Sequence, residues 1–290
     1  MKRFIILIVL INLSFTFGNP INVGSNHEIK TLKKAIAIAK DGDTIYVHKG
    51  IYKEGNIVIN KKLVLIGKDY PTFDGEKKVE VFSIKHDSVI FKGFKVINGA
   101  YGTITDPAAI KTYTVNNVVI ENNILDNNFF GIYLQNGDKC IVKNNKLRAY
   151  GKEEQQLGNG IHCWKSTNIQ VINNKVQGHR DGIYFEFVSE SVIWRNIVGN
   201  NIRYGLHFMF SHNNSYITNV FRNNGAGVAV MYTKNVTMMN NLFDENWGQS
   251  AYGLLLKEIT DSNILNNYFV KNTTAIYMEG SSRIKFKNND

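Results

Sequence analysis

Cysteine, proline and long apolar runs are all scarce in this chain of 290 residues. Two cysteines, Cys140 and Cys163, are too few for a disulfide framework, and we expect both as buried free thiols. With three prolines, 24 glycines and 43% hydrophobic residues, the chain has enough apolar material for a large core and should be globular. No stretch reaches the roughly 20 apolar residues that a membrane-spanning helix needs.

The N-terminus has the pattern of a secretory signal. Lys2 and Arg3 precede a short apolar run, Phe4 to Leu13, and small or polar residues follow to Gly18. We therefore predict a signal peptide over residues 1–18 and a single exported domain over residues 19–290. No cysteine follows the signal to carry a lipid.

Basic residues are in excess but are not clustered. The formal net charge of +10 falls by two, to +8, when Lys2 and Arg3 are removed, which suits an anionic partner or a membrane surface. No basic helix or run is present, so we expect no nucleic-acid partner.

An internal repeat of about 22 residues fills most of the chain. Each repeat opens on a small residue, and an asparagine stands fourteen residues after every opener. Alternating apolar residues with almost no helical spacing predict an all-β protein, a right-handed parallel β-helix of pectin-lyase-like solenoid type. The asparagines should bond from coil to coil as an internal ladder. The openers are Ala109, Gly131, Gly160, Gly182, Gly205, Gly227, Gly253 and Ala275, and the asparagines are Asn123, Asn145, Asn174, Asn196, Asn219, Asn241, Asn267 and Asn289.

A leucine-rich solenoid has a similar period, but its helical side is missing from this sequence. The one amphipathic helix that we predict, over residues 29–39, should cap the N-terminal end of the coils with Ile29, Leu32, Ile36 and Ala39. The last residues stop in the middle of a coil. We expect a C-terminal end that is truncated or covered by a partner.

Two outward positions of the repeat point to a metal site. Residues one and three after each opener are apolar and should fill the core, so residues two and four should point outward. Met209 and Met231 occupy position four of neighbouring coils, with starting points ~4.8 Å apart, and His207 lies at position two. Thioether and imidazole ligands select Cu(I) over hard cations. Glu186 and His212 are placed to contribute or to support the ligands. The alternative is that these side chains pack against a loop or a partner.

A second outward column lies twelve residues after each opener and is apolar in five successive coils. Such a stripe is typical of a protein contact surface. Burial beneath the inserted segment near residues 151–159, or beneath a missing C-terminus, is the alternative. The stripe residues are Ile172, Trp194, Ile217, Met239 and Leu265.

Several stretches between residues 180 and 280 carry a family resemblance. "RDGIYFEFVSESVIWRNI", "RYGLHFMFSHNNSY", "FRNNGAGVAVMYTKNV", "NWGQSAYGLLLKEITDSNI" and "NTTAIYMEG" resemble the NosD family of periplasmic maturation proteins of nitrous oxide reductase. Upstream, "AKDGDTIYVHKGIYKEGNIVINKKLVLIGKDYPTFDG" resembles the opening of carbohydrate-binding and sugar-hydrolase β-helices, which bears on the fold alone.

The resemblance implies a role without catalytic residues. It implies a periplasmic protein, held at the membrane through an ABC-type permease and ATPase. Such a protein would bind Cu(I) transiently, receive it from a copper-donating lipoprotein, and pass it to apo nitrous oxide reductase.

Two other functions stay open at this point. The first is a polysaccharide lyase, hydrolase or epimerase using residues among Asp181, Arg180, Glu186, Lys257 and Glu279. Glu186 and Glu279 lie four coils apart, ~19 Å at strand spacing, well beyond the ~5–9.5 Å of a glycosidase pair. The second is a metal-free scaffold that works through the apolar stripe.

Overall fold

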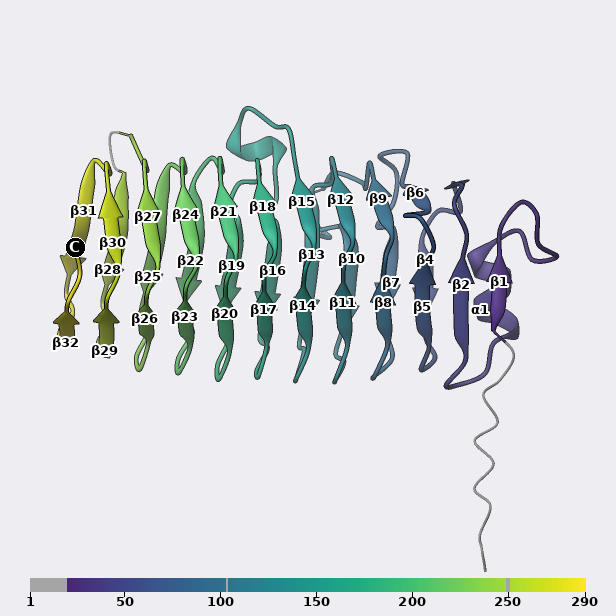
Figure 1. Ribbon diagram of the computed structural model, residues 1–290, viewed down its shortest axis with the longest axis horizontal. Helices are drawn as coiled ribbons and strands as arrows, with labels where there is room; N and C mark the ends of the chain where they lie inside the picture. Colours follow the sequence, from purple (N-terminus) through teal and green to yellow (C-terminus); the bar gives the residue numbers. More distant parts are fainter. Residues whose placement is uncertain (1–19, 103, 249–250) are drawn as a thin grey trace, which may run out of the picture.

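Three parallel sheets run along the whole stack of coils (Figure 1). The computed structural model describes residues 20–102, 104–248 and 251–290, so the predicted signal peptide lies outside the described residues. Each coil adds one strand to each sheet, and every strand pairs in parallel with the strands of the coils before and after it. The predicted all-β parallel solenoid is confirmed.

Sheet 1 has twelve strands and carries the predicted apolar stripe. Its strands are β1 (Ile21–Val23), β2 (Thr44–Val47), β5 (Val64–Gly67), β8 (Ile90–Lys92), β11 (Val119–Glu121), β14 (Ile141–Lys143), β17 (Gln170–Ile172), β20 (Val192–Trp194), β23 (Ser215–Ile217), β26 (Thr237–Met239), β29 (Thr260–Leu265) and β32 (Ser282–Lys287).

Sheet 2 has ten short strands that follow the asparagine-containing bend. They are β3 (Ile51–Tyr52), β6 (Thr72–Asp74), β9 (Lys95–Ile97), β12 (Ile124–Asp126), β15 (Lys146–Arg148), β18 (Lys175–Gln177), β21 (Ile197–Gly199), β24 (Val220–Arg222), β27 (Leu242–Asp244) and β30 (Tyr268–Val270).

Sheet 3 also has ten strands and carries the predicted metal ligands. Its strands are β4 (Ile57–Ile59), β7 (Phe82–Ile84), β10 (Ala108–Tyr113), β13 (Phe130–Gln135), β16 (Ile161–Trp164), β19 (Ile183–Glu186), β22 (Tyr204–Met209), β25 (Ala226–Met231), β28 (Tyr252–Lys257) and β31 (Thr274–Glu279).

The core lies inside the coils, where the alternation places it. Ile183 and Phe185 of β19 are fully buried, as are Leu206 and Phe208 of β22. Both cysteines are buried and free, as we expected. The small openers have a steric reason: a Cβ on Gly182 would lie 2.2 Å from the Val198 side chain.

The capping helix is shorter than we predicted. Helix α1 spans Leu32–Ile38, begins after Thr31, whose side chain accepts a hydrogen bond from the Lys34 N–H, and buries Leu32, Ala35 and Ile36. Ile29 lies outside it and forms a bridge to Val23, so its assignment to the helix was wrong. The cause is the N-cap, because a threonine in extended conformation starts the helix there. The only other helical turn in the described residues is η1, Glu154–Gln156. No helix in the part of the chain that the structure describes is long and apolar enough to cross a membrane.

The eight asparagines form the predicted ladder at the bend between sheets 1 and 2. In each step the side-chain oxygen of one asparagine accepts from the backbone N–H and the side-chain amide of the asparagine one coil earlier, at 2.9–3.0 Å. The seven members from Asn145 to Asn289 also donate to a carbonyl further back, at 2.7–3.1 Å. The ladder thus satisfies polar groups that the bend buries.

A second asparagine ladder lies five residues further on and was missed from the sequence. Asn201, Asn224, Asn246 and Asn272 bond in the same way from coil to coil at 2.8–3.2 Å. His179 stands at the head of this column, and its backbone N–H donates to Asn201. The Asn-x4-Asn spacing in successive repeats was the signal that predicts it.

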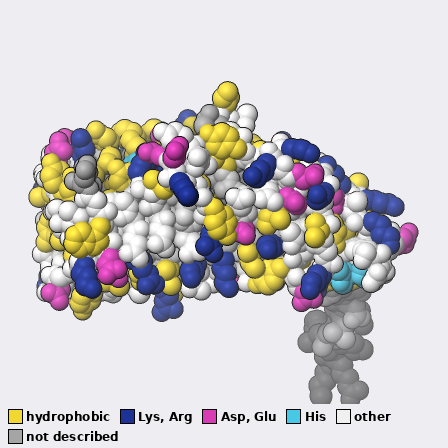
Figure 2. Space-filling view, turned by 90° about the horizontal axis from the view of Figure 1, so that it is seen from above, with side chains coloured by type: hydrophobic (Ala, Val, Ile, Leu, Met, Phe, Trp, Pro, Cys, Tyr) yellow, Lys and Arg dark blue, Asp and Glu magenta, His cyan; other side chains and the backbone are white. Residues whose placement is uncertain are grey.

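Basic side chains are spread along the molecule. Figure 2 shows Lys and Arg scattered over the visible face and interrupted by uncharged surface.

Candidate functional site

The candidate site lies on the outer face of sheet 3, where strand register sets the neighbours. Glu186 of β19 pairs in register with Met209 of β22, and Met209 pairs with Met231 of β25. Tyr184 pairs with His207 in the same way. The repeat therefore predicted the order of these side chains across the sheet.

A pocket of about 390 Å³ opens above these strands. It brings together three of the five predicted metal ligands, Glu186, His207 and Met209. Met231 is the register neighbour of Met209 just outside the lining, and both methionines are partly exposed. The pocket is lined by Asp106, Phe129, Phe130, His162, Arg180, Tyr184, Glu186, Arg203, His207 and Met209.

His212 does not join the pocket. It lies past the end of β22, and its ring Nδ1 accepts a hydrogen bond from the Lys234 N–H at 3.2 Å. Burial, and secondarily the charge of Lys234, lower the pKa of His212. The structure therefore gives His212 a role in bonding the neighbouring coil.

His207 points away from the solenoid core yet is only 6% exposed. Its Nδ1 lies 3.5 Å from the carboxylate of Asp181, and both ring nitrogens are buried without a hydrogen-bond partner. A buried polar atom without a partner is costly. The His207 ring is therefore able to offer a nitrogen to a ligand, although this side chain is more enclosed than the outward position predicts.

The Asp181 carboxylate anchors the wall behind His207. Arg203 donates to both of its oxygens, at 2.9 and 2.6 Å, and reaches Glu154 of the inserted segment at 3.2 Å. Burial alone would raise the pKa of Asp181, but contacts with His207 and Arg203 outweigh it, and the pKa is lowered. A negative charge is thus kept beside the imidazole, which fixes the orientation of the ring.

Tyr184 lies between His162 and His207 in the strand register of the pocket. Its hydroxyl donates to the Met209 sulfur at 3.5 Å, and its ring lies 4.9 Å from the His207 ring. Burial, and then the charge of Glu186, raise the pKa of Tyr184, so the hydroxyl keeps its proton at neutral pH. The Met209 thioether is therefore held toward the pocket by a weak bond that a soft ion would replace.

His162 is a pocket residue that the sequence reasoning missed. Asn159 bonds its Nδ1 at 3.2 Å, and its Nε2 is buried without a partner. Burial, helped by the Arg180 charge, lowers its pKa to about 3, so the ring is neutral. Its place in the column two residues after each opener was visible in the repeat. The Tyr184 ring lies between it and His207, 4.9 Å from each ring, so one ion bonded at ~2 Å does not reach both imidazoles.

Hard-metal coordination finds no support in these residues. Over residues 20–102, 104–248 and 251–290, no three His, Cys, Asp or Glu side chains come together as a metal site. The Met209 thioether is a soft ligand in this pocket. Thioether ligands select Cu(I) over hard cations.

The apolar stripe is continuous in register along sheet 1. Trp194 is 36% exposed, and the other four members are partly exposed. The inserted segment does not cover them, because it packs against Arg203 and Tyr101 instead. Burial beneath that segment, one of the two explanations left open, is therefore wrong. The pairs in register are Ile172 with Trp194, Trp194 with Ile217, Ile217 with Met239 and Met239 with Leu265.

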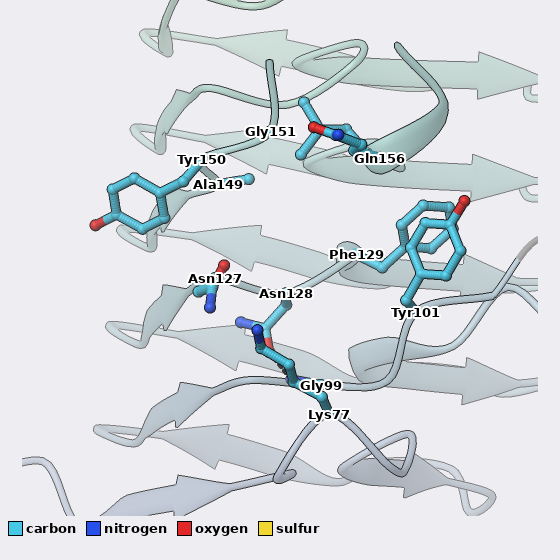
Figure 3. Close-up of a pocket in the computed structure, with 11 residues that line it drawn as sticks. Lys77, Gly99, Tyr101, Asn127, Asn128, Phe129, Ala149, Tyr150, Gly151 and Gln156 are labelled. Atoms are coloured by element: carbon cyan, nitrogen blue, oxygen red, sulfur yellow. Dashed lines mark hydrogen bonds between the residues drawn. The ribbon is translucent and has the colours of Figure 1, made fainter. Parts of the chain in front are cut away.

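A neighbouring pocket of about 310 Å³ shares Phe129 with the candidate site (Figure 3). Tyr101 and Phe129 lie edge to face on one side of it, with ring centroids 4.7 Å apart, and Tyr150 lies on the other side. Its polar lining consists of amides, tyrosine hydroxyls and Lys77. It contains no carboxylate or imidazole for acid–base chemistry and is not the candidate site.

The fold and the pocket together define a right-handed parallel β-helix with a polar, soft-ligand pocket on one sheet. Solved structures with the same architecture include the A-module of mannuronan C-5 epimerase AlgE4 from Azotobacter vinelandii, at 12% identity over 89% of this chain and 88% of that chain, TM-score 0.67. The surface adhesin PfbA of Streptococcus pneumoniae matches at 12% identity over 89% and 84%, TM-score 0.67. Pectate lyase Pel9A matches at 16% identity over 88% and 73%, TM-score 0.61. At these identities the likeness shows the fold alone.

The family comes from a different comparison. The family model described as "Periplasmic copper-binding protein (NosD)" matches residues 148–290, so this region of the chain is similar to the NosD family. The matched region contains every predicted metal ligand. No curated protein sequence matches the chain.

Proposed function

We propose that this protein is an exported copper-handling maturation factor that binds Cu(I) with His207, Met209 and Met231. The observation that carries the proposal is the unpartnered, buried Nε2 of His207 in a pocket shared with the Met209 thioether. Both lie in the region that matches a copper-binding family.

The ligand chemistry fits a transient cargo. Cu(I) accepts two or three soft ligands, and thioethers bind it without a proton to lose, so binding by the methionines is insensitive to pH. The Tyr184 hydroxyl competes weakly for the Met209 sulfur. Glu186, the register neighbour of Met209, would support the site through its charge.

The partners follow from the family and from the apolar stripe. We propose docking on apo nitrous oxide reductase together with an ABC-type permease and ATPase, with Cu(I) supplied by a copper-donating lipoprotein. The exposed stripe on sheet 1 offers a contact surface on a different sheet from the copper pocket. The protein would then work in the periplasm, held at the membrane through the transporter.

An anaerobic titration tests the ligand set. Against a Cu(I)-selective chelating competitor, the wild type should bind tightly, and the double variant Met209→Leu/Met231→Leu should lose at least about tenfold in affinity, the equivalent of about 1.4 kcal/mol. Met239→Leu, a thioether lost from sheet 1, is the matched control and should bind as the wild type does. Equal affinity in the double variant would refute these ligands.

A polysaccharide-active enzyme is the second candidate. The pocket holds Arg180, Asp106 and Glu186 beside a tyrosine and two imidazoles, groups able to neutralise a uronate and move a proton. Similar folds include, by their titles, a mannuronan epimerase and a pectate lyase. Glu279 does not belong to such a site, because it pairs with Lys257 at 3.8 Å, outside the pocket lining.

Two assays separate the remaining functions. Turnover of alginate or pectate by the purified protein, abolished in Glu186→Gln, would establish the enzyme. A metal-free scaffold would associate with nitrous oxide reductase equally well with and without Cu(I) and would bind no copper in the titration.

A further inference from the structure

Three exposed aromatic rings border the methionine column at the bend that ends sheet 3. Phe187, Phe210 and Tyr232 each follow directly after Glu186, Met209 and Met231. Their side chains are 46%, 37% and 39% exposed. We call these three residues the aromatic stack. Ring centroids are 5.3 Å apart between Phe187 and Phe210 and 5.2 Å apart between Phe210 and Tyr232, with interplanar angles of 10° and 15°.

The backbone at this bend disfavours bulky side chains. The residue five after each opener is left-handed in eight successive coils, with φ between 47° and 57°. In the aromatic stack the backbone N–H of each residue donates to a carbonyl of the next coil at 2.9–3.2 Å, which fixes the bend. Asparagine and glycine adopt this conformation readily, whereas an aromatic residue is an outlier there. The eight residues are Thr114, Asn136, Lys165, Phe187, Phe210, Tyr232, Glu258 and Gly280.

Folding alone does not account for the aromatic stack. The other five coils make the same bend with smaller or charged residues. The three rings are only partly buried in the folded chain, and their mutual stacking offsets the unfavourable backbone. Residues held in a disfavoured conformation gather at functional sites, and these three adjoin the candidate copper ligands.

The geometry of the rings selects the kind of partner. Because the rings stack face to face, the faces between them are occupied, and the solvent meets a strip of ring edges. A sugar needs a free ring face to stack on, whereas apolar protein side chains pack well against edges. Lys165 and Glu258 flank the strip at its two ends and give it the polar rim of a protein interface.

We propose that the aromatic stack is the docking surface for the protein that receives Cu(I) from this site. The inference rests on the proposed copper function. For an ion to pass between two proteins, both ligand sets must reach it within bonding distance, ~2.3 Å for sulfur. A partner seated over Met209 and Met231 therefore contacts the residues that border them, and the stack is that border.

Association with copper-free nitrous oxide reductase tests the proposal. In the triple variant Phe187→Asn/Phe210→Asn/Tyr232→Asn, the affinity for the reductase should fall at least tenfold, measured by biolayer interferometry. The Cu(I) affinity should stay within twofold of the wild type, and the urea midpoint should not fall, since asparagine suits the bend. Tyr268→Asn, which removes an exposed aromatic residue from sheet 2, is the control and should associate as the wild type does.

Three results would overturn the proposal. They are wild-type association in the triple variant, no association of the wild-type protein with the reductase, and competition by soluble alginate oligomers, which would assign the stack to a sugar. The Cu(I) titration is separate, so a wild type that binds no copper refutes the proposed function while the association still decides the docking surface.

Discussion

Removing one rung from the middle of the asparagine ladder should destabilise the protein strongly. Asn219 is 1% exposed and takes part in four side-chain hydrogen bonds. Its oxygen accepts from the Asn196 N–H at 2.9 Å and the Asn196 side-chain amide at 3.0 Å. Its own amide donates to the Ile193 carbonyl at 2.9 Å and to Asn241 at 3.0 Å. Asn219→Ala removes all four bonds at once.

The expected cost follows from what is left behind. The buried Asn196 N–H has no second partner, and an orphaned buried donor costs about 1–3 kcal/mol, while each of the other bonds contributes about 0.5–1.5 kcal/mol. We expect a loss of about 3–5 kcal/mol. Asn289→Ala is the matched control, because Asn289 is partly exposed and water replaces its bonds, for a loss of about 1 kcal/mol.

Urea denaturation followed by circular dichroism measures both variants. Stacked coils need not unfold in one step, so the slope of the transition must be compared together with its midpoint. If Asn219→Ala lost no more stability than Asn289→Ala, the ladder would not be a major source of stability, and the reasoning from buried unpaired groups would be wrong.

Three further predictions concern the site and its supports. Burial lowers the pKa of His179 to about 4, while the unfolded imidazole binds its proton near 6.5. The free energy of unfolding should therefore fall by about 1.4 kcal/mol for each unit that the pH drops between those values. His179→Asn should make the urea midpoint less sensitive to pH when it is compared at pH 7.5 and 5. Tyr184→Phe frees the Met209 sulfur and should raise Cu(I) affinity by up to about fivefold in the competitor titration; a lower affinity would make Tyr184 a ligand or support. Gly182→Ala should lower the urea midpoint, because its Cβ would meet Val198 and the Gly205 carbonyl; an unchanged midpoint would show that the coils relax.

Much of the fold was predictable because it repeats. The spacing of small openers and asparagines determines strand order and register, so the neighbours Met209 and Met231 followed from counting alone. The second asparagine ladder was equally visible and was missed because the column five residues after the first ladder was not aligned. His162 was also missed, although it stands two residues after the opener Gly160, as His207 stands two residues after Gly205.

The enclosure of the site was not predictable in the same way. Asp106 precedes the first aligned opener and Glu154 belongs to the inserted segment, so no alignment of coils places Asp106 in the pocket of His207 or Glu154 beside Arg203. The burial of His207 depends on these walls and on Tyr204 and Tyr184, whose rings pack on its own. Repetition predicts which side chains are neighbours, whereas irregular segments decide which of them meet water.

The left-handed bend five residues after each opener has a consequence for the evolution of such a protein. The same backbone turn recurs in eight successive coils with residues as different as asparagine, lysine and phenylalanine, so an exchange at this position alters one patch of the rim. A lineage could therefore trade sugar contacts for protein contacts, or the reverse, by a few substitutions along a single edge.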